Sequence, residues 1–208
     1  MKGIKFNEVH SYNDLHLAVA PFEIAPAKAK TTYLEIEGAD GSLDLTEALG
    51  EVKYSDRQGS LTFYVLPGDD WEQKKTEVSN YLNGLQCKMT LDKDPNYYYL
   101  GRFTVNSYKS DKMLRQITVD YRLKPYKYKK NVTIQTLKQG IHDISCDRMP
   151  VTPKITTTAN TTFSFNGGSY SVSAGTTQLL NIRFTAGTNQ LGITTTGTVT
   201  LEYQEGAL

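Results

Sequence analysis

Strict alternation of polar and apolar side chains over residues 116–123 is the feature that most constrains the fold. The apolar members are the odd-numbered residues: Ile117, Val119, Tyr121 and Leu123. A period of two is typical of a β-strand with one buried and one solvated face. Residues 86–91 and 97–106 also have strand character, so we predict three long strands, the third over residues 114–123 with one wet face.

One amphipathic helix is expected to follow Asp69 or Asp70. Either aspartate can cap its first turn and complement the helix dipole, and Asn83-Gly84 supplies a C-terminal stop. The apolar residues spaced by seven, four and three share one face: Trp71, Val78, Leu82 and Leu85. We interpret the tryptophan as a core anchor. Three charged residues are expected to project outward: Lys74, Lys75 and Glu77.

Shorter strands are predicted upstream, at residues 15–20 and 31–37, and residues 52–54 and 59–66 are predicted to form a hairpin. Over residues 33–37, Leu34 and Ile36 alternate with three more polar residues, which predicts a half-exposed strand. These elements together predict an α+β N-terminal domain over residues 1–130, built as a sheet or split barrel with one packed helix.

Composition changes near residue 130, and this change marks a domain boundary. Residues 1–130 contain 19 Lys/Arg and 18 Asp/Glu against 4 and 4 afterwards, while residues 151–208 hold 15 threonines against 10 in residues 1–150. The basic, tyrosine-rich residues 124–130 are interpreted as a solvated linker, because Pro125 cannot donate into a central sheet.

Short strands separated by Gly and Asn turns predict a small β-sandwich over residues 131–208, so that the whole chain is mainly β. Asn166-Gly167-Gly168 is the strongest hairpin turn among them. The expected strands are residues 152–158, 161–165, 169–173, 178–184, 190–194 and 198–203.

The balance of charge argues against broad capture of nucleic acid. Net charge is +1, from 23 basic and 22 acidic residues, whereas such capture needs a clustered basic face. No segment approaches the roughly 18 apolar residues of a membrane span, and the first residues lack the apolar stretch of a signal peptide. We therefore expect a soluble protein made in the cytoplasm, with Cys87 and Cys146 as buried or free thiols.

No group of residues indicates catalysis, a cofactor or a metal. One acidic turn copies the opening of an EF-hand loop: Asp92, Asp94 and Asn96. Calcium binding is not expected there, because Tyr97 stands where glycine is needed and Phe103 where a bidentate glutamate is needed. The histidines show no ligand spacing and are expected at exposed or loop positions: His10, His16 and His142.

Several motifs occur in one order along the first 130 residues. They are Asp-Gly-Ser-Leu-Asp-Leu-Thr-Glu at residues 40–47, a helix opened by Trp71, Leu-Asp-x-Asp-Pro at 91–95, Tyr-Tyr-x-x-Gly-Arg at 97–102 and Pro-Tyr-Lys at 125–127. In this order they resemble the distal tail protein (Dit) family of long-tailed bacteriophages and their prophage remnants. The resemblance implies a virion structural protein and not an enzyme.

What the resemblance implies is a ring-forming hub at the phage tail tip, made in the bacterial host and joining the tail tube to the baseplate or adsorption apparatus. The ring is expected to be a homohexamer of N-terminal domains, with galectin-like C-terminal sandwiches as docking sites for other tail proteins. A closed ring requires two different patches on each protomer that match head to tail.

Two segments are candidates for the subunit interface. By the resemblance, a hairpin or loop over residues 33–45 reaches the neighbouring subunit; its candidate residues are Tyr33, Ile36, Gly38, Asp40, Gly41, Leu43 and Leu45. An ordinary intramolecular hairpin is the alternative. The second segment places aromatic rings on both faces of one strand: Tyr97, Tyr98 and Tyr99. Surface rings at a sheet edge are the alternative there.

Two other functions are open at this point. A carbohydrate-binding sandwich would need aromatic rings to stack on sugars, and residues 131–208 after the linker offer few, most of them needed in a small core. Those rings are Phe163, Phe165, Tyr170, Phe184 and Tyr203. A tail-tube protein that stacks into continuous tubes is the other alternative, which the added sandwich disfavours.

Overall fold

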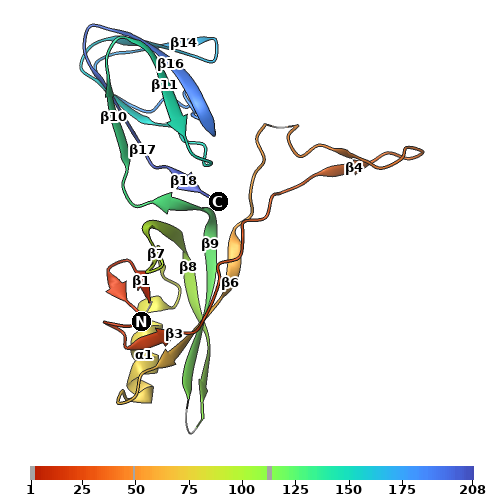
Figure 1. Cartoon of the computed structure of the whole chain (residues 1–208), viewed down its shortest axis with the longest axis vertical. Helices are drawn as coiled ribbons and strands as arrows, with labels where there is room; N and C mark the ends of the chain where they lie inside the picture. Colours follow the sequence, from red (N-terminus) through yellow and green to blue (C-terminus); the bar gives the residue numbers. More distant parts are fainter. Residues whose placement is uncertain (1–2, 49, 112–113) are drawn as a thin grey trace. The chain divides into compact units, whose positions relative to one another are not determined.

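The computed structural model describes residues 3–48, 50–111 and 114–208. The chain divides into two compact units, Met1–Pro125 and Tyr126–Leu208, each with its own hydrophobic core. Within the described residues the structure is mainly β, with one α-helix (Figure 1). The mainly β fold predicted from the sequence is confirmed.

One sheet forms the body of the first unit, in the order β2-β1-β7-β8-β9-β6-β3. Its strands are β1 (Ile4–Phe6), β2 (Val9–His10), β3 (Leu17–Val19), β6 (Arg57–Val65), β7 (Gln86–Leu91), β8 (Asp94–Ser110) and β9 (Arg115–Lys129). β6 pairs antiparallel with β9 from Arg57↔Leu123 to Tyr64↔Gln116. The three predicted long strands are β7, β8 and β9. β8 and β9 run beyond their predicted ends.

The alternation in residues 116–123 has the expected effect on burial. Its four apolar side chains lie in the core, whereas the polar ones between them are half-buried or exposed. Phe103 of β8 and Phe6 of β1 meet edge to face, with ring centroids 5.0 Å apart, and Phe63 lies 6.2 Å from Phe6. This aromatic contact joins strands that are distant in sequence into one core.

The predicted helix is confirmed as α1 (Trp71–Leu82). The Asp70 carboxylate accepts a hydrogen bond from the Gln73 N–H at 2.8 Å, and Asn83 is the C-cap. Lys74, predicted to project outward, is instead buried, because it follows Trp71 by three residues and precedes Val78 by four and so shares the apolar face. Its ammonium lies 2.6 Å from the Glu77 carboxylate, which compensates the buried charge.

The predicted hairpin of residues 52–54 and 59–66 is wrong. β6 pairs with β3 and β9, and residues 52–54 form no strand. Residues 53–55 lie beside residues 28–30 instead: the Lys30 N–H donates to the Lys53 carbonyl at 2.8 Å and Ser55 N–H to the Lys28 carbonyl at 2.9 Å. β6 begins at Arg57, so residues 57–59, which the predicted hairpin would place in its turn, belong to the strand. The pairing partner of residues 53–55 comes from much earlier in the chain.

Two four-stranded sheets form the second unit, in the orders β10-β17-β12-β15 and β11-β16-β13-β14. Their strands are β10 (Thr133–Leu137), β11 (Gly140–Cys146), β12 (Lys154–Thr157), β13 (Thr161–Phe165), β14 (Gly168–Val172), β15 (Gly175–Thr177), β16 (Gly187–Thr195) and β17 (Val199–Tyr203). Both sheets contribute to one core, which makes the predicted sandwich. Asn166 and Gly167, with φ of 48° and 77°, form the predicted tight turn between β13 and β14.

Residues 178–184 do not form the predicted strand. Ile182 and Phe184 are buried as an alternating pattern requires, yet within the described chain only Phe184 makes a bridge, with Val151. An irregular segment can therefore also bury alternate side chains in the core, so alternation by itself does not establish a strand here. β10, β11 and β15 were not predicted.

Residues 124–130 are not the solvated linker that was expected. β9 continues to Lys129, and its end pairs with β18 (Gly206–Ala207) through Tyr128↔Gly206 and Lys127↔Ala207. Lys129 lies 2.8 Å from the Asp147 carboxylate and 2.7 Å from that of Glu205, and these two contacts raise the pKa of its ammonium. One of the charges that suggested solvent exposure, that of Lys129, is thus paired, while Lys124 and Lys130 are exposed.

Candidate subunit interface

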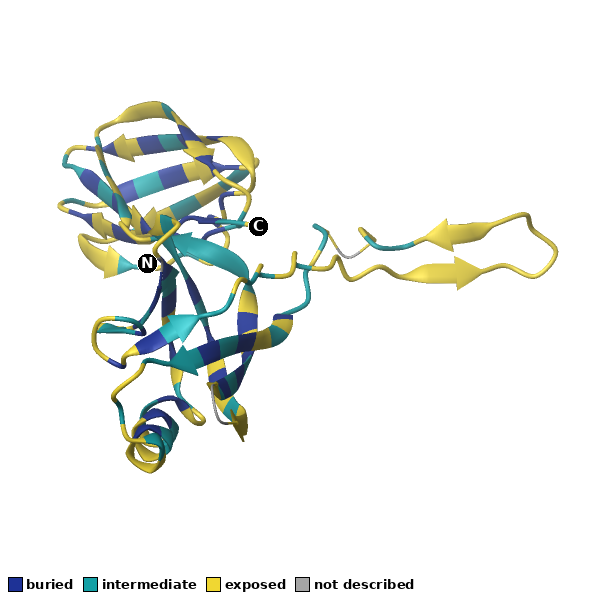
Figure 2. Cartoon of the chain, turned by 60° about the horizontal axis from the view of Figure 1, so that its bottom comes forward, coloured by how far each residue is buried: buried dark blue, intermediate teal, exposed yellow. Residues whose placement is uncertain are grey.

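A long hairpin, here called the arm, leaves the first unit between residues 28 and 55. Its strands are β4 (Tyr33–Glu35) and β5 (Ser42–Asp44), which form a two-stranded sheet of their own. The Leu45 N–H donates to the Thr32 carbonyl at 2.8 Å and extends the pairing toward the root. Every residue from 28 to 44 is exposed, and Figure 2 shows both strands of the arm in the colour of exposed residues.

Two glycines shape the tip of the arm. Gly38 and Gly41 have φ of 80° and 74°, a region that other residues rarely adopt, and the Ala39 N–H donates to the Ile36 carbonyl at 3.1 Å. Asp40 lies at this exposed turn. The turn is therefore defined by local backbone chemistry, and it fixes the register of the two strands.

That register gathers apolar side chains on one face. Leu34 lies opposite Leu43, and Ile36 follows two residues after Leu34 on the same side; the three are 50%, 49% and 48% exposed. The other face carries Tyr33, which is 56% exposed, with Glu35. The half-exposed strand predicted here is wrong, because neither face of the arm is covered. Leu34 was not among the predicted interface residues, although its alternation with Tyr33 and Glu35 places it on this face.

The arm is strongly acidic. Between Lys30 and Lys53 the sequence has no lysine or arginine and six carboxylates: Glu35, Glu37, Asp40, Asp44, Glu47 and Glu51. The Asp44 carboxylate accepts hydrogen bonds from Thr46, which hold its pKa below the usual range and keep it ionised at neutral pH. The arm thus has an apolar strip on one face, while the carboxylates of Glu35 and Asp44 lie on the opposite face.

The three tyrosines of β8 do not form one surface. Tyr99 is buried in the core, and the Arg57 guanidinium lies 5.6 Å from its ring centroid, so this tyrosine does not lie on the surface that a subunit interface requires. Tyr97 and Tyr98 are half-buried, and the Lys88 ammonium lies 4.7 Å from the Tyr98 ring centroid. The sequence signal that could have predicted the burial of Tyr99 is alternation, because residues 99, 101 and 103 share the inward face of β8.

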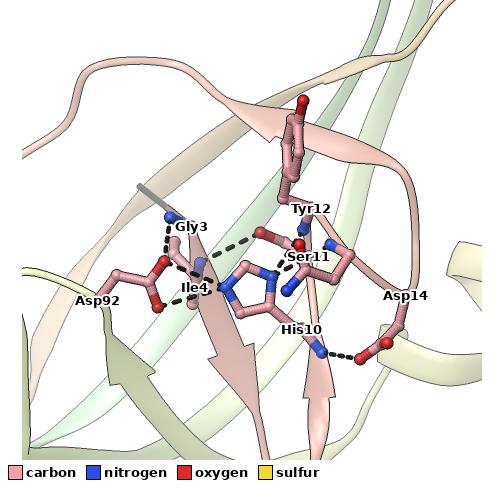
Figure 3. A network of polar contacts seen from close by, with 8 residues as sticks. Gly3, Ile4, His10, Ser11, Tyr12, Asp14 and Asp92 are labelled. Atoms are coloured by element: carbon pink, nitrogen blue, oxygen red, sulfur yellow. Dashed lines mark hydrogen bonds and ion pairs between the residues drawn. The ribbon is translucent and has the colours of Figure 1, made fainter. Parts of the chain in front are cut away.

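A polar network that the sequence did not predict surrounds His10 (Figure 3). Its Nδ1 accepts hydrogen bonds from the backbone N–H groups of Tyr12 and Asn13 at 3.1 and 3.2 Å, and its Nε2 lies 3.1 Å from the Asp92 carboxylate. Because Nδ1 accepts, the neutral ring carries its proton on Nε2 and donates it to Asp92. His10 is thus a bonded part of the fold, contrary to the expectation of an exposed or loop histidine.

Asp92 is the acidic turn residue that resembled the start of a calcium loop. Partial burial raises its pKa, but hydrogen bonds from the Gly3 N–H and from His10 lower it more, so its pKa lies below the usual value. The carboxylate therefore joins the first strand of the chain to the β7–β8 turn. Its role here is structural.

The fold and the arm together define a class of protein: a mainly β chain of two compact units, the first of which carries an exposed amphipathic hairpin. Neither the family models nor the curated proteins gave a match. Among solved structures, the Dit protein of SPP1 matches with a TM-score of 0.73 over 98% of this chain and 99% of that chain, at 13% identity.

That structure is described as a paradigm of the hub adsorption apparatus in phages that infect Gram-positive bacteria. The fold expected from the resemblance to the Dit family is confirmed. In the described part of this chain, no helix has the length and apolar character to cross a membrane.

Proposed function

We propose that this chain is a structural protein of a phage tail: a Dit-like hub at the tail tip that joins the tail tube to the host-adsorption apparatus. The observation that supports it most is the match to SPP1 Dit over nearly the full length of both chains. In this role the protein is part of the virion, binds no cofactor and catalyses no reaction. Its partners are further copies of itself and other tail proteins.

The exposed arm supports assembly into a ring. An apolar strip that none of the described residues of its own chain covers is unusual in a protein that stays monomeric. A ring needs a heterologous interface, in which a projecting patch on one subunit meets a different patch on the next. We assign the projecting patch to the arm, the ring to residues 1–130 and the docking of tail proteins to residues 131–208; the number six rests on the family resemblance.

Burial of the aromatic residues disfavours the carbohydrate-binding alternative. In the second unit, the rings of Phe163, Phe165, Phe184 and Tyr203 are buried in the core and Tyr170 is half-buried. Sugar recognition by stacking would need such a ring at the surface. Binding of the full chain on a glycan array would favour this alternative over the hub.

Mass in solution and electron microscopy test the proposal together. We expect the full chain to form rings by negative staining and a discrete oligomer by light scattering. Replacing residues 36–41 by a two-residue Asn-Gly turn shortens the arm and should leave monomers. Long tubes in place of single or paired rings would identify a tube protein instead, and a strictly monomeric chain at high concentration would refute the proposal.

A further inference from the structure

The segment that enters the arm, residues 21–27, is not held to the first unit by a backbone ladder. It is here called the rising leg, and it contains Pro21 and Pro26, which have no N–H group to offer a neighbouring strand. The chain bonds β6 just before this leg and residues 53–55 just after it, but no backbone hydrogen bond holds the described residues between. Side chains must therefore fix the rising leg in place.

Arg57, the first residue of β6, supplies the missing bonds with its side chain. Its Nη1 donates to the Ala25 carbonyl at 3.0 Å, and its Nε donates to the Pro125 carbonyl of β9 at 2.9 Å. The guanidinium thus joins three segments of the first unit: the rising leg, the strand on which the chain returns from the arm, and β9. These bonds hold both ends of the arm to the same sheet.

Two buried tyrosines complete this contact. The ring centroid of Tyr99 lies 5.6 Å from the Arg57 guanidinium, which is a cation–π contact. Burial raises the pKa of Tyr121, while a backbone hydrogen bond from Ala25 lowers it, because the amide donates to the phenol oxygen. Ala25 is therefore held at its carbonyl by Arg57 and at its N–H by Tyr121.

The guanidinium is a buried charge that no carboxylate compensates. Arg57 is 6% exposed, and among the described residues it forms no ion pair and its Nη2 has no hydrogen-bond partner. Arginine cannot lose its proton in a protein, so its burial costs free energy. An apolar residue of similar volume at such a site is often as stabilising or more so. Stability alone therefore does not explain the arginine, whereas the position of its two acceptors does.

We propose that Arg57 is the positioning residue of the arm: its planar fork fixes the rising leg to β9 and so sets the direction in which the arm leaves the first unit. This inference rests on the proposed function, because an arm that is ordered in advance loses less conformational entropy when subunits assemble. Lysine cannot take this role, since its ammonium is a single centre and does not span two carbonyls with fixed geometry.

Amide exchange of Arg57→Met, measured on the full chain below the concentration at which it assembles, tests the assignment. The N–H groups of Lys30 and Ser55 bond the opposite leg, and they should exchange about ten-fold faster once the charged hydrogen bonds are lost. The melting temperature of the first unit should stay near that of wild type. Arg57→Lys should behave like Arg57→Met. The matched control is Arg122→Met, which removes a 68% exposed arginine of β9 and should change neither measurement.

Three results would overturn the inference. The first is wild-type exchange of these two amides in Arg57→Met, and the second is wild-type exchange in Arg57→Lys, which would mean that charge suffices without the fork. The third is a lower melting temperature with lost protection throughout the first unit, including the Phe103 N–H that bonds the Leu85 carbonyl, because Arg57 would then stabilise the whole unit.

Assembly provides a separate readout. Arg57→Met should associate several-fold more weakly than wild type, since its arm must become ordered on contact. Unchanged association, despite faster exchange of the two amides, would overturn the link between the position of the arm and assembly. A wild-type chain that never assembles would refute the hub proposal, whereas the exchange results on the single chain would still decide the role of Arg57 in holding the arm.

Discussion

Replacing the two facing leucines of the arm should weaken assembly without changing the fold. Leu34 and Leu43 are paired across the hairpin and are 50% and 49% exposed, so assembly can still cover about half of each side chain. Complete burial of a leucine contributes about 1.5–3 kcal/mol, so covering the exposed half contributes about 1 kcal/mol. Leu34→Ser with Leu43→Ser should then cost about 2 kcal/mol per contact, a roughly 30-fold weaker association.

The folded monomer should keep its stability in the same variant. The two side chains are 50% and 49% exposed, and substitutions at exposed sites usually change unfolding free energy by less than about 0.5 kcal/mol. Sedimentation velocity over a concentration series measures the association, and calorimetry measures the melting temperature. Leu180→Ser is the matched control, since Leu180 is 79% exposed in the second unit and should leave assembly unchanged.

Two results would refute this reasoning. Association within about three-fold of wild type would mean that the apolar strip is not covered on assembly. A clear fall in the melting temperature of the double variant would mean that the leucines stabilise the monomer, so that weaker assembly would have a trivial cause. The control variant separates an effect of the arm from a general effect of removing exposed leucine.

Three further predictions concern stability and reactivity. Phe103→Ala should destabilise the first unit by about 3–5 kcal/mol, which the fluorescence of Trp71 can measure, and should leave the melting of the second unit unchanged. A change in the melting of both units would contradict separate cores. The folded pKa of Asp92 is depressed, so its stabilisation is present above the unfolded pKa near 3.9 and is lost as pH falls through the folded value. Asp92→Asn should therefore lower stability in urea at pH 7 but hardly at pH 2, and an equal loss at both would contradict the network. Burial raises the pKa of Cys87 to about 12 and of Cys146 to about 11, so neither should react with a thiol reagent at pH 8 until denaturant is added; fast labelling of the native chain would be inconsistent with both.

Features determined by local sequence were predictable. The helix from Trp71 follows from a capping aspartate and apolar spacing, and the turn at Asn166-Gly167 follows from two residues that tolerate positive φ. The strand over residues 116–123 follows from alternation, since its inward side chains fill the core. In each case the residues that decide the structure are within about one helical turn or one hairpin of each other.

Features determined by distant partners were not predictable. His10 and Asp92 lie 82 residues apart, and nothing near either one indicates the other. Residues 52–54 have the composition of a strand, but their partner at residues 28–30 was not identifiable from local pattern. For the arm itself, the family resemblance identified the segment and alternation identified its apolar face. Its complete exposure depends on what the rest of the chain leaves uncovered.

The absence of lysine and arginine between Lys30 and Lys53 gives the arm a further property. Both lysines are exposed in the free chain, at the root where the Lys30 N–H bonds the Lys53 carbonyl. Trypsin can therefore remove the whole hairpin as one peptide of 23 residues, spanning residues 31–53, without a cut inside it. Under the proposed head-to-tail ring, a subunit digested in this way loses the apolar strip, so we expect it to accept the arm of one neighbour and to offer none to the next, which would stop ring closure.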